Sequence, residues 1–187
     1  MSRKVLLMTY FPSPTYEEVT DPKVQAIYDE IKAELGFGIV PNLFKSMTIR
    51  PNFLAAQWQH FRTTILQGTL PRTLKEMIGV AISQTNHSEY ALRVHLHSLS
   101  ALGISEEVLH LLVTDPANCP LPERQKQAIL FGLRVATQPQ DVSEQDYAHL
   151  KSLGLSKAEI FEIIATANLF TGVNQYTDAI ALEIDQL

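Results

Sequence analysis

Acid–base side chains gather in one polar stretch that separates two apolar stretches. Residues 84–95, QTNHSEYALRVH, include two histidines, a serine, a glutamate, a tyrosine and an arginine, and the preceding apolar run LKEMIGVAI contains Glu76. A carboxylate and an imidazole that lie close together can transfer a proton to or from a bound molecule. Glu76 and His95 are therefore the first candidates for an acid–base site.

Helical spacing predicts that these two side chains face each other. Glu76 and Ser83 are seven residues apart and share one face of a helix, and Ser88, Ala91 and His95 share a face of the next helix at intervals of three and four. The connection between the two helices is short, so we expect them to be neighbours. Glu76 can then approach His95.

A purely structural role is the alternative for each of these residues. A glutamate on an apolar helix often pairs with an arginine or a backbone amide, and Ser88 precedes a helix, where its hydroxyl can accept a backbone N–H as an N-cap. His95 and His97 are two residues apart and point to different sides of the helix, so we expect no metal pair and a solvated His97.

The elements that must position these residues are all predicted to be helices. The intervals between apolar residues and the capping signals predict an all-α chain, a single domain over residues 1–187 with an N-terminal arm over 1–20 and a short extended segment at VLLMTYF. Two Ser-x-x-Asp/Glu capping boxes, at Ser143 and Ser156, begin the last two helices. Predicted helices cover KVQAIYDEIKAEL, VPNLFKSM, PNFLAAQWQHFRTTIL, RTLKEMIGVAISQ, about 88–103, EEVLHLLV, PERQKQAILFGLRVAT, a helix from Ser143, and about Lys157–Ile184.

Composition narrows the classes of function. The net charge of −5 and the scattered basic residues argue against a nucleic-acid partner, and the apolar run IFEIIATANLFTGV is interrupted by Glu162 and too short to span a membrane. The lone Cys119 permits no intrachain disulfide, and no zinc-type cluster is present. We expect a soluble cytoplasmic protein that uses neither a metal nor a cofactor.

The chain resembles the alkyl hydroperoxidase D-like and carboxymuconolactone decarboxylase superfamily, in its uncharacterised peroxidase-related subgroup. Glu76 is followed after eleven residues by Ser88-Glu89-Tyr90-Ala91 and after three more by His95, where the peroxidase branch has Glu, eleven residues, Cys-x-Tyr-Cys or Cys-x-x-Cys, three residues and His. The flanks VPNLFKSMTIRPNFLAA, TLPRTLKEMIGVAISQTN and ATANLFTGVNQYTDAIALEI are also similar, with Gln175 in place of an arginine. The resemblance runs from about Phe11 to Glu183 and implies an alkyl hydroperoxidase D-like helical bundle.

The chain departs from this family at both motif cysteines, which are replaced by Ser88 and Ala91. In the peroxidase branch a thiolate attacks the peroxide, becomes a sulfenic acid and is resolved to a disulfide, assisted by the Glu and the His. A serine hydroxyl is far less acidic and alanine is inert, so we expect no dithiol cycle. The resemblance implies Glu76, His95 and Ser88 as the catalytic candidates. The residues expected near them are His87, Tyr90, Ala91 and Ser83.

Three functions remain open at this point. The first is a cysteine-independent acid–base enzyme on a small organic substrate, of the decarboxylase or lactone type, because the decarboxylase branch works without cysteines, although with a different motif. The second is a non-catalytic pseudoenzyme that acts as a binding or scaffold oligomer, and the third is an antioxidant role through Cys119. The resemblance, together with apolar residues in FLAAQWQHF and the last helix, predicts a homo-oligomer: a dimer, trimer or hexamer. An open cavity at Glu76 and His95 would favour catalysis, and a closed contact the scaffold.

Overall fold

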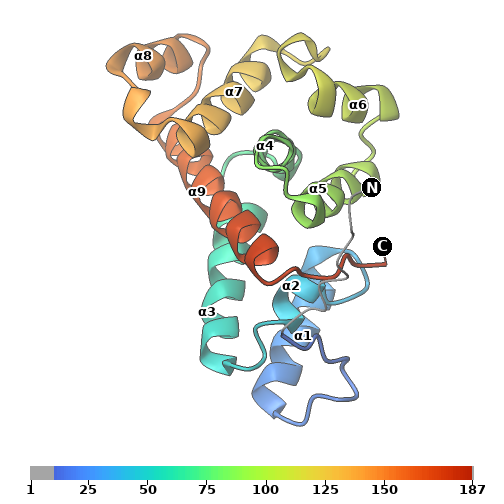
Figure 1. Ribbon diagram of the computed structural model, residues 1–187. Coiled ribbons are helices and arrows are strands. Elements are labelled where there is room, and N and C mark those ends of the chain that lie inside the picture. Colours follow the sequence, from blue (N-terminus) through green and yellow to red (C-terminus); the bar gives the residue numbers. More distant parts are fainter. Residues whose placement is uncertain (1–10, 187) are drawn as a thin grey trace.

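The computed structural model describes residues 11–186, and within them every regular element is a helix (Figure 1). This confirms the predicted all-α class. The helices are α1 Pro22–Leu35, α2 Asn42–Lys45, α3 Pro51–Phe61, α4 Arg72–Thr85, α5 Glu89–Ala101, α6 Glu106–Thr114, α7 Glu123–Thr137, α8 Glu144–Ser152 and α9 Lys157–Ala179, with a π-helix η1 at Arg62–Leu66 and 3-10 turns η2 at Pro116–Asn118 and η3 at Pro139–Asp141.

Three predicted helix starts, those of α1, α8 and α9, are confirmed by capping bonds. The Asp21 side chain accepts the Lys23 backbone N–H ahead of Pro22, and both predicted capping boxes form, at Ser143 and Ser156. These side chains satisfy backbone N–H groups that have no partner inside the helix. The segment VLLMTYF lies almost entirely outside the described residues, and the single-domain assignment stays a prediction.

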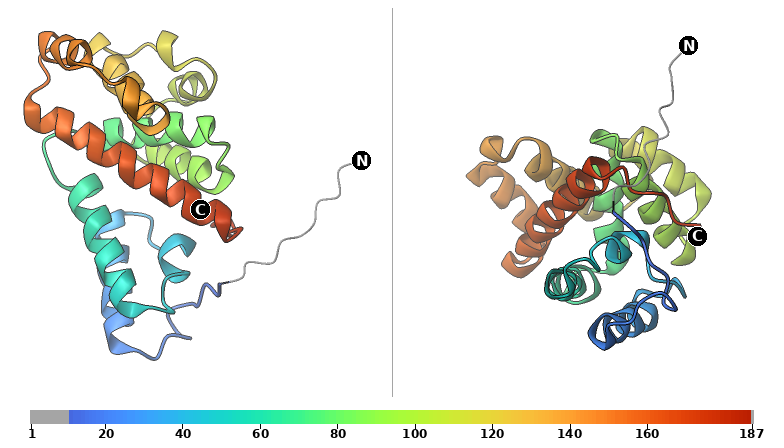
Figure 2. Two further views of the ribbon diagram at one scale, coloured as in Figure 1. Left: turned by 60° about the vertical axis from the view of Figure 1, so that its left-hand side comes forward. Right: turned by 60° about the horizontal axis from the view of Figure 1, so that its bottom comes forward.

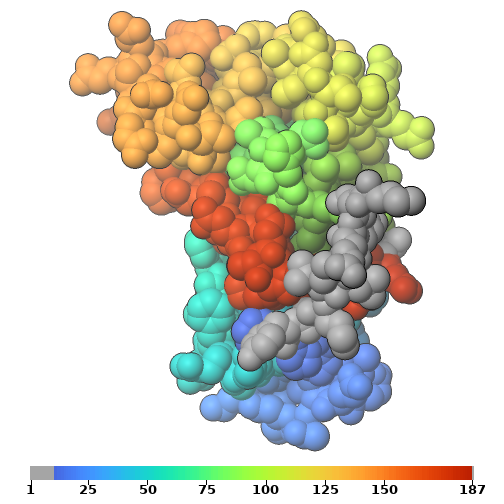
Figure 3. All heavy atoms as spheres, viewed as in Figure 1, coloured from blue at the N-terminus to red at the C-terminus, as the bar shows by residue number. Residues whose placement is uncertain are grey.

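Two hydrophobic clusters hold the helices together. The larger surrounds α4, which is buried on all sides from Leu74 to Ser83 and is seen end-on at the centre of Figure 1. The smaller joins α1–α3 to Tyr90 and to the segment after α9, and the other views show α9 crossing the molecule between the two groups of helices (Figure 2). On the face drawn in Figure 3, the C-terminal part of α9 lies between the α4–α5 region and α1–α3. The helices α4 and α5, which were predicted to face each other, thus lie where the two clusters meet.

The last helix is shorter than predicted. It ends at Ala179, and residues 180–186 continue without helix, so the predicted extension to Ile184 was wrong. The reason is a competing set of bonds: Asp185 accepts the Asn42 backbone N–H at 2.8 Å and the Tyr90 hydroxyl at 2.6 Å. The non-helical segment after α9 carries this carboxylate to the start of α2.

A buried ion pair fixes α4 to α9 and to the π-helix. Lys75 is fully buried, and its Nζ donates to the carbonyls of Thr64 at 2.8 Å and Gln67 at 2.5 Å and lies 3.0 Å from Glu162 Oε2. Glu162 also accepts the backbone N–H of Thr69 at 2.7 Å, so both charged groups are fully hydrogen-bonded. A buried charge that is satisfied in this way costs little, but removal of its partner is expensive.

Substitution of Lys75 by methionine is expected to lower the free energy of unfolding by about 3–5 kcal/mol, because it leaves two carbonyls and a carboxylate without their cation. Urea unfolding followed by circular dichroism measures this. The matched control is Lys126→Met, which breaks the surface pair with Glu123 and should leave the unfolding midpoint unchanged. Equal effects in the two variants would contradict a special role for the buried pair.

Candidate functional site

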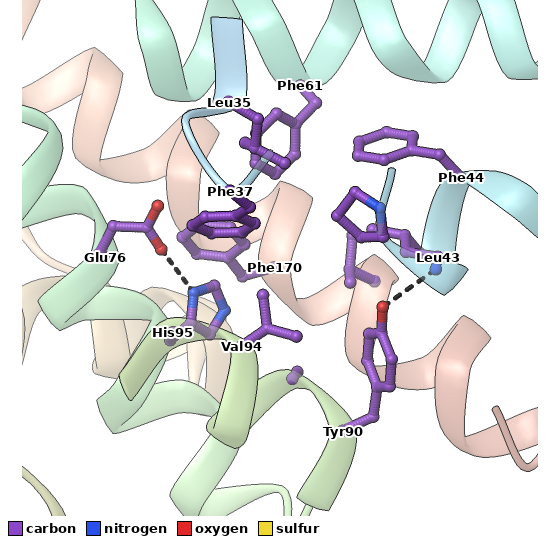
Figure 4. A pocket seen from close by; sticks show the side chains of 13 residues that line it. Leu35, Phe37, Leu43, Phe44, Phe61, Glu76, Tyr90, Val94, His95 and Phe170 are labelled. Carbon is purple, nitrogen blue, oxygen red and sulfur yellow. Dashed lines mark hydrogen bonds and ion pairs between the residues drawn. The ribbon is translucent and has the colours of Figure 1, made fainter. Parts of the chain in front are cut away.

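Glu76 and His95 form the centre of a buried polar network between α4 and α5. His95 Nδ1 lies 2.7 Å from Glu76 Oε2, and each residue is at most 5% exposed. The predicted contact between the two side chains is therefore confirmed (Figure 4). It joins two helices that follow each other in the chain and are linked only by residues 86–88.

The second carboxylate oxygen of Glu76 is held by two residues that the sequence interpretation missed. Ser98 Oγ donates to Glu76 Oε1 at 3.0 Å, and Arg72 Nε donates to the same oxygen at 3.2 Å. Arg72 also donates to the Leu35 carbonyl at 2.9 Å. Both residues carried a usable signal, because Arg72 precedes Glu76 by four residues and Ser98 follows His95 by three, so each shares a helix face with its neighbour.

The electrostatics of this network fix the charge of the carboxylate. Burial acts to raise the pKa of Glu76, but the hydrogen bond and charge of His95, the Arg72 charge and the Ser98 hydroxyl outweigh it, and the pKa lies below its ordinary value. An ionised carboxylate can only accept hydrogen bonds, so Nδ1 of His95 must be the donor. Nε2 is then the ring nitrogen that is free to exchange a proton.

The imidazole lies directly on the backbone of α4 at Gly79. A Cβ atom at this position would come within 2.6 Å of His95 Cε1 and 2.7 Å of Nε2. On its other side the ring meets Phe170 edge-on, with 4.3 Å between the ring centroids. The absence of a side chain at residue 79 thus sets the distance between α4 and the imidazole, and with it the contact to Glu76.

Nε2 of His95 is buried and has no hydrogen-bond partner among the described residues. Figure 4 shows this nitrogen turned away from Glu76, on the side of a small cavity of about 30 Å³, which has room for about one or two waters. Four phenylalanines contribute to its walls. The lining residues are Leu35, Phe37, Pro41, Leu43, Phe44, Phe61, Glu76, Tyr90, Ala91, Val94, His95, Phe170 and Val173.

The two positions that carry cysteines in the peroxidase branch lie in different surroundings. Ala91 lines the cavity, whereas Ser88 turns to α9 and donates to Asp178 Oδ1 at 2.8 Å. Ser88 occupies the N-cap position of α5, but its side chain accepts no backbone N–H. The predicted side-chain cap is therefore wrong, because the carboxylate of Asp178 takes the hydroxyl instead.

Two further candidates lie outside the cavity. Ser83 is buried and donates to Asn174 Oδ1 at 3.2 Å on α9. His87 is exposed in the turn between α4 and α5, with a φ of 57°. Neither lines the cavity.

Tyr90 contributes its ring to the cavity and uses its hydroxyl elsewhere. The hydroxyl donates to Asp185 and accepts the Leu43 backbone N–H at 3.0 Å, and burial raises the pKa of Tyr90 above its ordinary value. The tyrosine therefore fastens α5 to α2 and to the segment after α9. Its proton is donated to Asp185, so the hydroxyl is not a proton donor to the cavity.

The burial of His97 and Cys119 bears on two further predictions. His97 is half-buried, with Phe37 edge-on at 5.4 Å between centroids, so it is only partly solvated. Cys119 is 1% exposed next to the Val108 carbonyl, and burial raises the pKa of its thiol. Because peroxide chemistry needs a thiolate, this environment disfavours the antioxidant route through Cys119.

Substitution of Gly79 by alanine is expected to destabilise the protein by about 1–3 kcal/mol, because the new methyl group displaces the imidazole. The His95 ring resonances in a nitrogen-15 spectrum should shift with it. Gly172→Ala on α9 is the matched control: nothing lies within 4 Å of its Cβ position, and removal of a helical glycine should stabilise by about 0.5–1 kcal/mol. If Gly79→Ala leaves the stability unchanged, the close approach of the His95 ring to α4 is not required.

The lowered pKa of Glu76 predicts a specific pH dependence. A carboxyl group whose folded pKa lies below its unfolded value of 4.5 stabilises the fold above that value and loses the contribution as pH falls through the folded pKa. Between about pH 5 and pH 3, the free energy of unfolding should fall more steeply in the wild type than in Glu76→Gln. Glu89→Gln removes an exposed ion pair with Arg93. This variant should show the same dependence of the free energy of unfolding on pH as the wild type. Equal slopes for all three proteins would contradict the buried, ionised Glu76.

No helix of residues 11–186 has both the length and the apolar character to cross a membrane. The cytoplasmic location stays a prediction.

Comparison with known proteins gives the same fold over nearly the whole chain. A peroxidase-related protein from Ralstonia eutropha JMP134, described as an alkylhydroperoxidase AhpD core, superposes with a TM-score of 0.85 at 23% identity, over 94% of this chain and 92% of that one. A peroxidase-related protein from Silicibacter sp. TM1040 gives 0.83 at 24% identity and 96% of both chains. The debrominase Bmp8, in a cysteine-to-alanine variant bound to 2,3,4-tribromopyrrole, gives 0.75 at 18% identity, over 88% of this chain and 87% of that one. No curated protein matches significantly.

The sequence itself matches the carboxymuconolactone decarboxylase family over residues 51–118. This stretch contains Glu76, Ser88, Ala91 and His95, so the family match covers the site as well as the central helices. The predicted resemblance is confirmed: residues 51–118 match the carboxymuconolactone decarboxylase family model, and the chain has the all-helical fold of solved proteins described as peroxidase-related.

Proposed function

We propose that the chain is a cysteine-independent acid–base enzyme that acts on a small organic molecule, with His95 as the proton-transfer group and Glu76 as its partner. One observation carries this proposal: Nδ1 is held by a buried carboxylate, while Nε2 faces a cavity and has no hydrogen-bond partner within residues 11–186. A carboxylate that fixes one ring nitrogen orients the other and stabilises the imidazolium that forms when it takes a proton. The substrate would bind in the cavity, with the reacting proton at Nε2.

The replaced cysteines are consistent with chemistry of this kind. Ala91 brings no reactive group to the cavity, and the alcohol of Ser88 is committed to Asp178. Ser88 therefore takes no part in the proposed proton transfer. The remaining thiol, Cys119, is buried outside the cavity. A peroxide-reducing dithiol cycle has no residues here to perform it.

The structural neighbours support a small organic substrate without naming one. Two of them are described as peroxidase-related, whereas Bmp8 is a debrominase that binds a brominated pyrrole. One fold thus carries more than one chemistry, and the activity must be argued from the site of each protein. In this chain the site offers an acid–base pair in apolar surroundings.

The second candidate is a non-catalytic binding or scaffold oligomer. The small cavity volume favours it, as do exposed apolar side chains at Ile49, Phe53 and Phe161, which are 62%, 47% and 69% exposed. The stretch FLAAQWQHF contributes less to such a surface than its composition indicates, because Leu54 and Trp58 are buried in the smaller hydrophobic cluster. A homo-oligomer remains part of both candidates.

Exchange of a substrate proton with solvent tests proton transfer directly, whatever the product of the reaction is. Halogenated pyrroles, phenols and unsaturated lactone acids are incubated with the protein in deuterated water, and deuterium incorporation or conversion is followed by NMR and mass spectrometry. We expect catalysis with at least one compound class, and a fall of about 10²–10⁴-fold in His95→Gln. Glu76→Gln should also lower the rate, because its amide no longer stabilises an imidazolium.

Cys119→Ala is the control for thiol chemistry and should keep the full rate. Loss of activity in this variant would revive the antioxidant alternative. An unchanged rate in His95→Gln would exclude the proposed role of His95. Absence of exchange and conversion in every class would favour the scaffold.

A further inference from the structure

Among the described side-chain atoms that line the cavity, one buried polar atom has no hydrogen-bond partner. Three polar residues line the cavity, but Glu76 is saturated by His95, Ser98 and Arg72, and the Tyr90 hydroxyl is bonded to Asp185 and Leu43. Nε2 of His95 is left as the atom that can bind a ligand directionally. The rest of the wall is aliphatic, aromatic or proline.

The direction of that hydrogen bond follows from the network. Nδ1 donates to Glu76, so in the neutral form of the imidazole, the form that the proposed base requires, Nε2 presents its lone pair to the cavity. A ligand must therefore bring a donor, an N–H or an O–H. A ligand with only acceptor atoms would leave Nε2 unpaired in a dry environment, which is costly.

The charges next to the cavity disfavour an anionic ligand. Arg72 is the cation next to the cavity, and its guanidinium is already committed to Glu76, the Leu35 carbonyl and Ser98. A carboxylate in the cavity would meet phenylalanine rings and the Glu76 charge, and the His95 imidazolium, the cation that could face it, is already paired with Glu76. Burial of an unpaired charge in such surroundings is strongly unfavourable.

The cavity of about 30 Å³ is too small for an aromatic ring as it stands, so one wall must move. Phe44 and Phe170 are buried in helices, at 2% and 1% exposure, and Phe61 ends α3. Phe37 differs, because it lies on the non-helical segment between α1 and α2 and is half-buried.

The surroundings of Phe37 allow its displacement. Its neighbours Gly36 and Gly38 have φ values of 85° and 70°, and no atom lies within 4 Å of their Cβ positions. The ring packs at the edge of the smaller hydrophobic cluster and makes two weak directional contacts, edge-on to His97 and under the Arg72 guanidinium at 5.7 Å. Contacts of this kind contribute little each, so the ring can leave the cavity without disturbing a helix.

We propose that the cavity at His95 binds a neutral aromatic molecule with one N–H or O–H donor, and that Phe37 is the movable wall that admits it and limits its size. This deepens the proposed function by naming the class of its substrate. Binding can occur with or without turnover.

The test measures affinities for phenol, toluene and benzoate at neutral pH by ligand-observed NMR, with the His95 ring nitrogens followed in a labelled protein. Phenol should bind and shift the Nε2 resonance. Toluene lacks the donor and should bind about tenfold more weakly, and benzoate more weakly still. Benzoate binding as tight as that of phenol, or phenol binding without a shift at Nε2, would overturn the ligand class.

The role of Phe37 is tested with a larger probe, 1-naphthol. Phe37→Ala should strengthen naphthol binding about tenfold or more relative to phenol, and Phe37→Leu should give a smaller gain in the same direction. Phe161→Ala, on the exposed face of α9, should leave both affinities unchanged. If both Phe37 variants are folded by circular dichroism and keep the wild-type preference, Phe37 is not the movable wall.

The outcomes separate this inference from the proposed function. Phenol binding at His95 with no proton transfer in any compound class would keep the ligand site and exclude the enzyme. Proton transfer on a compound class while phenol fails to bind would keep the enzyme and exclude this ligand class.

Discussion

The structure depends on one buried negative charge. Glu76 is ionised on a helix that is covered on every side, and an unpaired carboxylate there would be prohibitively costly. Its hydrogen bonds come from Arg72 on the same helix and from His95 and Ser98 on the next. Because two donors lie three residues apart on α5, they set the rotation of that helix about its axis and the depth at which it packs on α4. The tautomer of His95 follows from the same requirement.

The motif positions that distinguish this chain from the dithiol peroxidases fall into two structural environments. Position 88 belongs to the contact between α5 and α9, and position 91 belongs to the cavity. Glu76 and His95 line the same cavity as Ala91, but their hydrogen bonds involve neither motif residue. The acid–base pair therefore persists without the thiols, since its geometry is maintained by Arg72, Ser98 and the missing side chain of Gly79.

Local signals predicted most of the fold and the centre of the site. Capping residues and apolar intervals gave the helix starts, and helix spacing alone brought Glu76 and His95 together, because both depend on residues a few positions apart. The errors concern distant partners. The hydroxyl of Ser88 is taken by Asp178, ninety residues away, and α9 ends early because Asp185 bonds to α2. The cavity walls come from α1 to α5 and from α9, so no single stretch of sequence contains them.

The hydrogen bond between Ser88 and Asp178 has a consequence for protein engineering. A redesign that installs cysteines at positions 88 and 91 would place the first thiol at a helix N-terminus, which favours the thiolate, but also beside an exposed carboxylate, which raises the thiol pKa. The two influences oppose each other, so the sulfur would be a poorer nucleophile than the motif alone suggests. Recovery of thiol chemistry on this scaffold thus requires a third change, at Asp178, on a helix that the motif does not include.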